Sequence, residues 1–245
     1  MAKASLGGYD GKGTRVINCK KDLINLAKTV DVNNWFLEKW IPYERELALI
    51  SSRDSNGQIR HFPLVETSQS QQVCNWVIAP ADISHSVKLM AHNIASSLLV
   101  ELNYFGVMAI EFFYGEDGLQ INEIAPRTHN SAHFSIEACS SSQFDQYICI
   151  SSGIKPPEIN MHSEGSLMIN LLGLKNFHLS LEKRIELLSQ IKGSNLHWYG
   201  KSKESVGRKM AHITFLINEE NHLKREEKSK EILNKVREIW PSPNK

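Results

Sequence analysis

Two carboxylates inside two apolar, strand-like segments constrain this chain more than any other feature. The segments GVMAIEFFY (106–114) and LQINEIAP (119–126) are rich in β-branched and aromatic residues and are separated by turn-forming residues, so they predict a β-hairpin. Glu111 and Glu123 interrupt these strands, and Asn122 precedes the second carboxylate. A buried carboxylate without a partner costs free energy. A bound Mg²⁺ ion, which prefers oxygen ligands, would remove that cost and bring a nucleotide phosphate with it.

The metal prediction depends on the register of this hairpin, because directly opposed residues share one face of a sheet. A turn over residues 115–118 would pair Tyr114 with Leu119 and put the two carboxylates on opposite faces. We therefore predict either a turn over residues 115–119 or a β-bulge, since either would bring the carboxylates to one face. The alternative is that one carboxylate points to solvent from an edge strand.

Glycines are concentrated near the start of the chain, in the segment LGGYDGKGTRV. Four of them fall within residues 7–13, and the segment continues into a predicted strand, not a helix. Glycine lets backbone N–H groups approach a phosphate closely, and Lys12 adds a positive charge. The spacing matches neither a P-loop nor a dinucleotide-binding fingerprint. A phosphate-binding loop and a plain β-turn both stay open.

A polar loop, APRTHNSAHFS, directly follows the second carboxylate strand. It carries Arg127, His129, Asn130, Ser131 and His133. Because arginine can hold a phosphate or a carboxylate through two parallel hydrogen bonds, we interpret the loop as a binding site for an anionic ligand. An ordinary solvated loop is the alternative.

A basic segment, HWYGKSKESVGRKMAH (197–212), surrounds a predicted turn at Gly207. Its cationic residues are Lys201, Lys203, Arg208 and Lys209. A basic hairpin can cover a phosphate, and an ordinary solvated turn is the alternative. By contrast, the mixed charges of KREEKSKE (224–231) are typical of a solvated helix face.

Composition excludes several classes of protein. The 245 residues include 28 Lys+Arg and 27 Asp+Glu, a net charge of +1, and 41% are hydrophobic. This balance argues against a nucleic-acid binder, and no run of about 18 apolar residues predicts a membrane span. The first residues lack the apolar stretch of a signal peptide, and four scattered cysteines fit free thiols in a reducing compartment. We therefore expect a cytoplasmic protein without nucleic-acid or membrane partners.

Hairpins and helices that follow each other without a regular βαβ alternation predict an α+β fold. We expect Asp82 to cap a helix with an apolar stripe. The positions of that stripe are Val87, Met90, Ile94, Leu98 and Leu102. Glycine and two prolines within 153–163 predict a boundary between a domain over residues 1–155 and a C-terminal domain over residues 156–245.

Together, these segments resemble the ATP-grasp ligases, and most closely the branch of that family that carboxylates 5-aminoimidazole ribonucleotide. The matching segments keep the family's order over nearly the whole chain. They are GGYDGKG, EKWIPYERELALI, PLVET, VIAPA, GVMAIEFF, INEIAPRTHNSAH, SQFDQYI and HWYGK followed by GRKMAHIT. The resemblance implies an ATP-grasp fold, in which two α+β lobes hold ATP between them, with a small β-rich C-terminal unit.

The same resemblance implies an ATP- and bicarbonate-dependent carbon–nitrogen ligase of de novo purine (IMP) biosynthesis, with ATP and Mg²⁺ as cofactors. In such enzymes bicarbonate attacks the γ-phosphate to give carboxyphosphate, whose breakdown delivers carbon dioxide to the exocyclic amine of 5-aminoimidazole ribonucleotide. This chemistry needs charge neutralisation and positioning more than acid–base groups. Family members commonly pair, so a homodimer is a further expectation.

Residue roles follow from the resemblance. Glu111 and Glu123 are the expected metal ligands. Arg127, His129 and Asn130 are the expected catalytic residues. The residues expected to bind the ribonucleotide are Arg127, His129, Asn130, Ser131, Lys201, Arg208 and Lys209.

The residues expected to bind ATP come from the first 46 residues of the chain and from the second carboxylate strand. They are Lys3, Gly7, Gly8, Tyr9, Asp10, Gly11, Lys12, Gly13, Glu38, Lys39, Trp40, Ile41, Glu46, Asn122 and Glu123. By resemblance, Lys3 contacts phosphate and residues 7–13 close over the phosphates as a lid that excludes water. The segment 38–41 flanks adenine, and Glu46 accepts the ribose hydroxyls.

The chain departs from the family in several places. Thr128 and Ala132 stand where members often have Pro and Gly, which we expect to change only loop stiffness. Gln69 stands near a nucleotide-contacting His of some members and is assigned no role.

The largest departure is at the front of the chain, because the family has an N-terminal α/β domain before the position of Lys3. Two alternatives to a working ligase follow: a truncated, non-catalytic Mg–ATP-binding remnant, and a subunit that needs a separate N-terminal piece. A different ATP-grasp ligase acting on another carboxylate is disfavoured by the APRTHNSAH loop.

Overall fold

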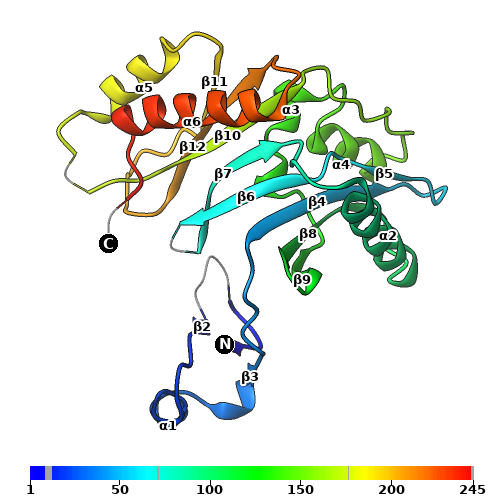
Figure 1. Ribbon diagram of the computed structural model, residues 1–245, viewed down its shortest axis with the longest axis vertical. Coiled ribbons are helices and arrows are strands. Elements are labelled where there is room, and N and C mark those ends of the chain that lie inside the picture. Colours follow the sequence, from blue (N-terminus) through cyan, green and yellow to red (C-terminus); the bar gives the residue numbers. More distant parts are fainter. Residues whose placement is uncertain (9–12, 71, 176, 244–245) are drawn as a thin grey trace. The chain divides into compact units, whose positions relative to one another are not determined.

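The computed structural model describes residues 1–8, 13–70, 72–175 and 177–243. The chain forms two compact units (Figure 1). The first comprises Met1–Pro42 with Gln69–Val73, and the second comprises Tyr43–Ser68 with Cys74–Lys245. The boundary near residue 155 stays a prediction.

The first unit is a small antiparallel sheet with one helix. Its strands are ordered β2-β1-β3, and Ala2, the first residue of β1, is fully buried. The strand predicted directly after the glycine-rich segment is short and covers only Thr14–Arg15. The elements are β1 (Ala2–Ala4), β2 (Thr14–Arg15), α1 (Lys20–Ala27), η1 (Val32–Asn34) and β3 (Trp35–Leu37).

The second unit is built around a large sheet. Its described strands lie in the order β11-β12-β10-β7-β6-β4-β8-β9, and β5 pairs with β4. The strands are β4 (Arg45–Arg53), β5 (Ile59–His61), β6 (Val65–Ser70), β7 (Val73–Ala79), β8 (Gly106–Gly115), β9 (Gly118–Ala125), β10 (Gly165–Leu172), β11 (Ser194–Trp198) and β12 (Lys209–Ile217). The helices are α2 (His85–Glu101), η2 (Asn130–Ala132), α3 (Ser135–Ala138), α4 (Gln143–Ser151), α5 (Leu181–Ser189) and α6 (His222–Ile239).

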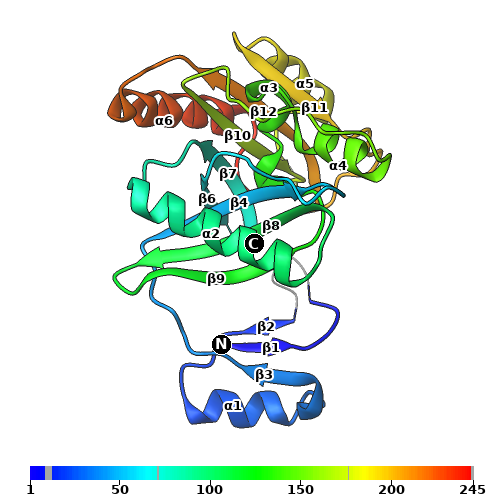
Figure 2. The same cartoon turned by 90° about the vertical axis from the view of Figure 1, so that its right-hand side faces the viewer.

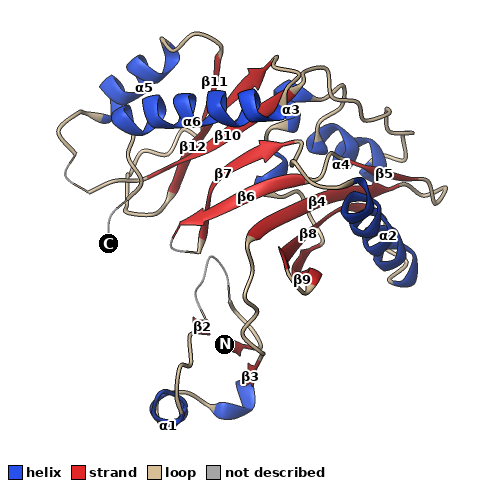
Figure 3. Cartoon of the chain, in the orientation of Figure 1, coloured by secondary structure: helices blue, strands red, loops and turns tan. Residues whose placement is uncertain are grey.

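Alternating side chains divide the core of this unit between the two faces of the sheet. On one face, α2 packs on β4 and β8, and α5 and α6 pack on β10 and β12. Figure 2 shows α2 in front of β4, and Figure 3 shows the strands as one layer with helices outside it. On the other face, Ala48 and Ala109 pack against Ala132 and Phe134 of the segment that contains η2 and α3. This second face carries the candidate site.

The start of α2 differs from the expectation. Ser84, not Asp82, is the N-cap, since its Oγ accepts the N–H of Val87, whereas the Asp82 carboxylate lies 3.4 Å from Nε2 of His222. Both residue types favour N-cap positions, and here the later one begins the helix.

The apolar stripe expected on α2 is also shifted by one position. The buried positions are Ala91, Ala95 and Leu99, while Met90 and Leu102 of the expected stripe are about half exposed. Small alanines let the helix lie close to the sheet, and the larger neighbouring residues flank the contact.

The expected fold class and the expected free thiols are confirmed. The fold is α+β, and all four cysteines are free thiols. None of the described helices combines the length and the apolar character that crossing a bilayer requires.

Candidate functional site

A β-bulge in the β8–β9 hairpin brings the two predicted metal ligands to one face of the sheet. Glu111 lies directly opposite Glu123, whereas the next pair along the hairpin is Phe112 with Ile121. Asn122 is therefore the extra residue of the bulge. Without this shift in register, one of the two carboxylates would point to the opposite face.

The predicted bulge is confirmed. The alternative, a turn over residues 115–119, is wrong, because Gly115 pairs with Gly118 and the turn between them is tight.

A third carboxylate adds negative charge at Glu111. Glu46 and Ala48 of β4 pair with Phe113 and Glu111 of β8, so Glu46 and Glu111 point to the same face. The Glu111 side chain is 21% exposed. Burial, followed by the charges of Glu123 and Glu46, raises its pKa to about 7. The positive charges of Lys209 and Arg127 act in the opposite direction. The site is therefore short of positive charge.

The donor set fits Mg²⁺. Glu111 and Glu123 offer carboxylate oxygens on one face, and the Asn122 amide follows in the bulge. Among the described residues, no group of three or more His, Cys, Asp or Glu side chains could hold a metal ion. A cation here would thus need further oxygens, which agrees with Mg²⁺, because Mg²⁺ usually binds one or two carboxylates together with waters and substrate phosphates.

The predicted anion-binding loop faces the carboxylates. His129 Nε2 lies 3.6 Å from Oε1 of Glu111, and His129 Nδ1 lies 2.8 Å from Oγ of the buried Ser131. Asn130 Nδ2 donates to Oδ1 of Asn170 at 3.0 Å. Asn170 is itself held on β10 by its hydrogen bond to the Cys74 carbonyl at 2.9 Å. The loop is therefore fixed to both the hairpin and the centre of the sheet.

The basic residues after β11 form a crowded group. Lys201 Nζ donates to the Lys209 carbonyl, and Arg208 donates to the Lys203 carbonyl at 2.9 Å. Burial, followed by the charges of Arg208 and Lys209, lowers the pKa of Lys201. A bound anion would stabilise the charged form of Lys201 that its cationic neighbours disfavour. Lys203, for which no role is predicted, contributes its carbonyl to this group.

The remaining ATP-binding candidates lie in the first unit or outside the described residues. In the first unit, Lys3 Nζ and Glu38 Oε2 form an ion pair at 2.6 Å. The carbonyl of Gly13 accepts the Ala4 N–H at 2.8 Å. Gly7, Gly8, Lys39, Trp40 and Ile41 belong to the same unit. Tyr9, Asp10, Gly11 and Lys12 lie outside the described residues.

The site also contains a group of rings whose mutual contact was not predicted from the sequence. The His197 ring stacks on His212 with centroids 4.4 Å apart, and the His133 ring lies 4.8 Å from His212. Tyr199 Oη and His212 Nδ1 are 2.7 Å apart, and Glu137 pairs with His197 at 2.5 Å. His197 and His212 pair across β11 and β12, but no spacing rule in the sequence links either of them to His133.

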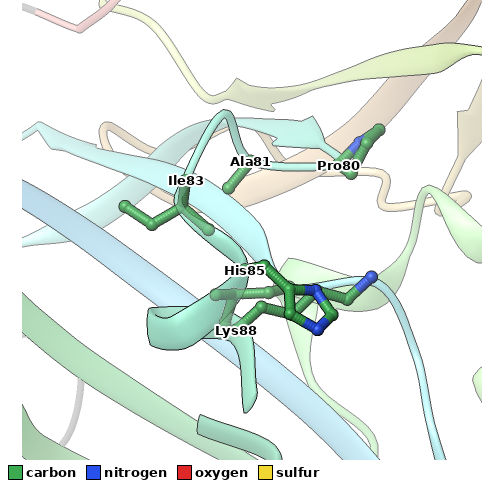
Figure 4. Close-up of a pocket in the computed structure, with 6 residues that line it drawn as sticks. Pro80, Ala81, Ile83, His85 and Lys88 are labelled. Atoms are coloured by element: carbon green, nitrogen blue, oxygen red, sulfur yellow. The ribbon is translucent and has the colours of Figure 1, made fainter. Parts of the chain in front are cut away.

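A pocket of about 280 Å³ lies elsewhere in the second unit. Figure 4 shows its lining, which is formed by Leu64, Pro80, Ala81, Ile83, His85 and Lys88 at the start of α2. None of these described lining residues was predicted to act in the site. The carboxylate face, not this pocket, therefore carries the functional argument.

Comparison with known proteins identifies the family. A family model for the ATP-grasp domain matches residues 1–144, which is more than half of the chain. The chain belongs to the ATP-grasp family. A second model, for the phosphoribosylaminoimidazole carboxylase C-terminal domain, matches residues 166–226. The expected fold class and family resemblance are thereby confirmed.

The chain is similar in sequence and in structure to N5-carboxyaminoimidazole ribonucleotide synthases. It is 38% identical to N5-carboxyaminoimidazole ribonucleotide synthase of Synechococcus elongatus, over 97% of this chain and 60% of that protein. The Staphylococcus aureus N5-carboxyaminoimidazole synthetase complexed with ADP matches with a TM-score of 0.81 and 36% identity, over 94% of this chain and 60% of that one.

The N5-carboxyaminoimidazole synthase of Aspergillus clavatus, in complex with ADP and 5-aminoimidazole ribonucleotide, matches with a TM-score of 0.83 and 28% identity, over 96% of this chain and 61% of that one. The chain thus spans about 60% of the length of these relatives.

Proposed function

We propose that this chain binds Mg–ATP at the Glu111–Glu123 hairpin and uses it, with bicarbonate, to carboxylate 5-aminoimidazole ribonucleotide in purine biosynthesis. The observation that carries the proposal is the bulge at Asn122, which puts both carboxylates on one face beside the loop of Arg127 and His129. The similarity to N5-carboxyaminoimidazole ribonucleotide synthases supports the choice of substrates.

The reaction asks the protein mainly to neutralise and position charge. Glu111 and Glu123 would hold Mg²⁺, which supplies charge neutralisation at the β- and γ-phosphates. Arg127 lies close enough to lower the pKa of Glu111 and would bind the bicarbonate-derived group. Asn130, fixed by Asn170, would present its amide to the same group.

The crowded cations would hold the ribonucleotide phosphate. Arg208 and Lys209 help to lower the pKa of Lys201, and a phosphate with two negative charges would relieve the repulsion among the three cations. In the first unit, Lys3, the glycines of residues 7–13 and the segment 38–41 are proposed to contact ATP. A cytoplasmic location and a homodimer stay predictions.

A second candidate is a Mg–ATP-binding chain that is inactive without another polypeptide. It is favoured by the coverage of the comparisons, since the chain spans about 60% of the relatives' length. Both candidates predict the same nucleotide site and differ in turnover.

Release of ADP from Mg–ATP distinguishes the two. We expect the chain to release ADP only when both 5-aminoimidazole ribonucleotide and bicarbonate are present. Binding of Mg–ATP without substrate-dependent ADP release would favour the second candidate. Absence of Mg–ATP binding would contradict both.

A further inference from the structure

Gln143 is a fully buried amide at the first position of α4 that no predicted role uses. Its backbone is held firmly. Ser142 and Asp145 form a reciprocal capping box at the start of the helix, and the Gln143 N–H donates to Oγ of the buried Ser135 at 3.1 Å. A side chain that starts from such a fixed backbone can hold its partners in place.

The Gln143 side chain forms two hydrogen bonds with the backbone of His129. The His129 N–H donates to Oε1 of Gln143 at 2.7 Å, and Nε2 of Gln143 donates to the His129 carbonyl at 2.8 Å. A backbone N–H can only donate and a carbonyl can only accept. The orientation of the amide is therefore fixed by its partners, and a flipped amide would lose both bonds.

The second hydrogen on Nε2 of Gln143 sets the state of His133. Nδ1 of His133 lies 3.0 Å from that nitrogen, so it must accept a hydrogen bond, and the ring must be neutral with its hydrogen on Nε2. Burial, followed by the charges of His129, Lys209 and His197, lowers the pKa of His133 to about 4. The rings of Phe144 and His212 also pack against it.

The hydrogen bonds from Gln143 to the His129 backbone determine where the His129 ring lies. The ring Nδ1 accepts the Ser131 N–H at 3.4 Å and lies 2.8 Å from Ser131 Oγ. The ring hydrogen is therefore on Nε2, the atom that faces Glu111 Oε1 at 3.6 Å. Each of these contacts depends on the place of the His129 backbone, which the Gln143 amide holds.

We propose that Gln143 is a positioning residue, whose amide clamps the His129 backbone and the neutral His133 ring so that His129 Nε2 faces Glu111. The proposal rests on the proposed function, in which His129 and Glu111 lie at the phosphates. Because a misplacement of about 1 Å can cost about a hundredfold in rate, such a clamp is expected to affect turnover more than nucleotide binding.

Gln146 provides a matched control. It lies one turn later on α4, is equally buried, and its amide is also fully engaged. Its partners are Ser52, Ser141 and the Pro157 carbonyl, which lie outside the loop of residues 127–133. Gln146→Met should lower stability about as much as Gln143→Met, because both remove buried hydrogen bonds.

The first arm of the test is an imidazole NMR titration of the full chain, with the His133 signal assigned by its loss in His133→Gln. In the wild type we expect the neutral Nε2–H form down to about pH 4. Gln143→Glu places a carboxylate oxygen against Nδ1 and should raise the His133 pKa by about one unit or more. Gln146→Glu should leave it unchanged.

The second arm measures ADP release and Mg–ATP affinity for Gln143→Met and Gln146→Met. We expect Gln143→Met to lower kcat about ten- to hundredfold and to leave the Kd of Mg–ATP within about twofold. Gln146→Met should retain its kcat. Equal losses of kcat in the two variants would overturn the positioning role.

The two arms separate failure of the clamp from failure of the proposed function. A wild-type chain without ADP release contradicts the proposed function, and the titration then still decides the clamp. An unchanged His133 pKa in Gln143→Glu, or an Nδ1–H tautomer in the wild type, overturns the clamp.

Discussion

Glu111 combines burial with two neighbouring negative charges. Its pKa is raised to about 7, by burial first and then by Glu123 and Glu46. Near neutral pH, its ionised form is therefore unfavourable in the absence of a cation. Glu123, by contrast, is exposed. The pair thus offers one carboxylate that gains strongly from a cation and one that is readily reached by it.

The substitution Glu111→Gln should stabilise the metal-free protein at alkaline pH. The folded-state pKa of Glu111 lies above its ordinary value of 4.5. The protonated side chain therefore contributes its full stabilisation of the folded state below about pH 4.5, and this stabilisation is lost as the pH rises through about 7. The loss is on the order of 3 kcal/mol. Glutamine cannot ionise and avoids it. Urea unfolding in EDTA at pH 5 and pH 8 measures the difference.

The exposed Glu101 at the end of α2 provides the control for this experiment. Glu101→Gln should show the wild-type pH dependence. If Glu111→Gln also shows the wild-type pH dependence of unfolding, burial of the Glu111 charge is not costly. The electrostatic argument for a bound cation then fails.

At the scale of elements, the loop between β11 and β12 is anchored by a buried ion pair. Arg184 of α5 is 3% exposed and donates to both carboxylate oxygens of Glu204, at 3.0 and 2.6 Å. Glu204 Oε1 also accepts the Leu174 N–H at 2.8 Å. The Gly173 backbone pairs with Arg208, and a Cβ on Gly173 would lie 2.1 Å from the Ser205 carbonyl oxygen. The loop of proposed phosphate ligands is therefore closely packed.

Breaking this anchor should be costly, and removing both partners should cost less than the sum. Glu204→Gln leaves the buried Arg184 charge without its partner, so we expect the free energy of unfolding to fall by about 3 kcal/mol. Adding Arg184→Met should recover part of that loss. A double-mutant cycle by urea unfolding measures the coupling.

The exposed pair Lys183–Glu186 on the same helix is a matched control, at 2.9 Å and about half exposed. Its coupling should be much weaker than that of Arg184 with Glu204, because water solvates both of its side chains. Equal coupling in the two pairs would contradict the anchoring role of Glu204.

Some elements could be predicted from the sequence because their determinants are local. The bulge at Asn122 follows from the period of two in a strand and from the need to put Glu111 and Glu123 together. The start of α2 could not be fixed, because Asp82 and Ser84 are both good caps, and only the packing of the helix selects between them.

Long-range partners could not be predicted. Gln143 lies within a recognised motif, but its contact with His129 depends on how α4 docks beside the loop. Likewise, nothing in the sequence near Asn130 indicates its partner Asn170, forty residues away. Such contacts are set by tertiary packing, which no local pattern records.

At the scale of the whole molecule, buried histidines should make the chain sensitive to acid. Burial lowers the pKa of His61 and His133 to about 4 and that of His212 to about 2. Below about pH 6.5, these histidines bind protons in the unfolded chain but stay neutral in the folded chain. The free energy of unfolding therefore falls as the pH falls. At pH 5 the loss is on the order of 2 kcal/mol for each histidine, which outweighs the opposite contribution of Glu111.

We therefore expect a lower urea midpoint at pH 5 than at pH 7.5, measured by circular dichroism. His61→Gln should weaken this dependence, and the exposed His178→Gln should not change it. A midpoint at pH 5 equal to or above that at pH 7.5 would show that these rings are not held neutral.

Isothermal titration of Mg–ATP into the wild type, Glu123→Gln and Glu116→Gln tests the carboxylate site most directly. Glu116 lies in the tight turn of the same hairpin, between Gly115 and Gly118, so its substitution controls for a general change of charge. Glu123 is exposed, so Glu123→Gln should leave the fold intact. We predict that Glu123→Gln weakens Mg–ATP binding by about a hundredfold or more, while Glu116→Gln stays within about twofold of the wild type. Equal affinity of Glu123→Gln and the wild type would contradict a Mg–ATP site at the bulged hairpin.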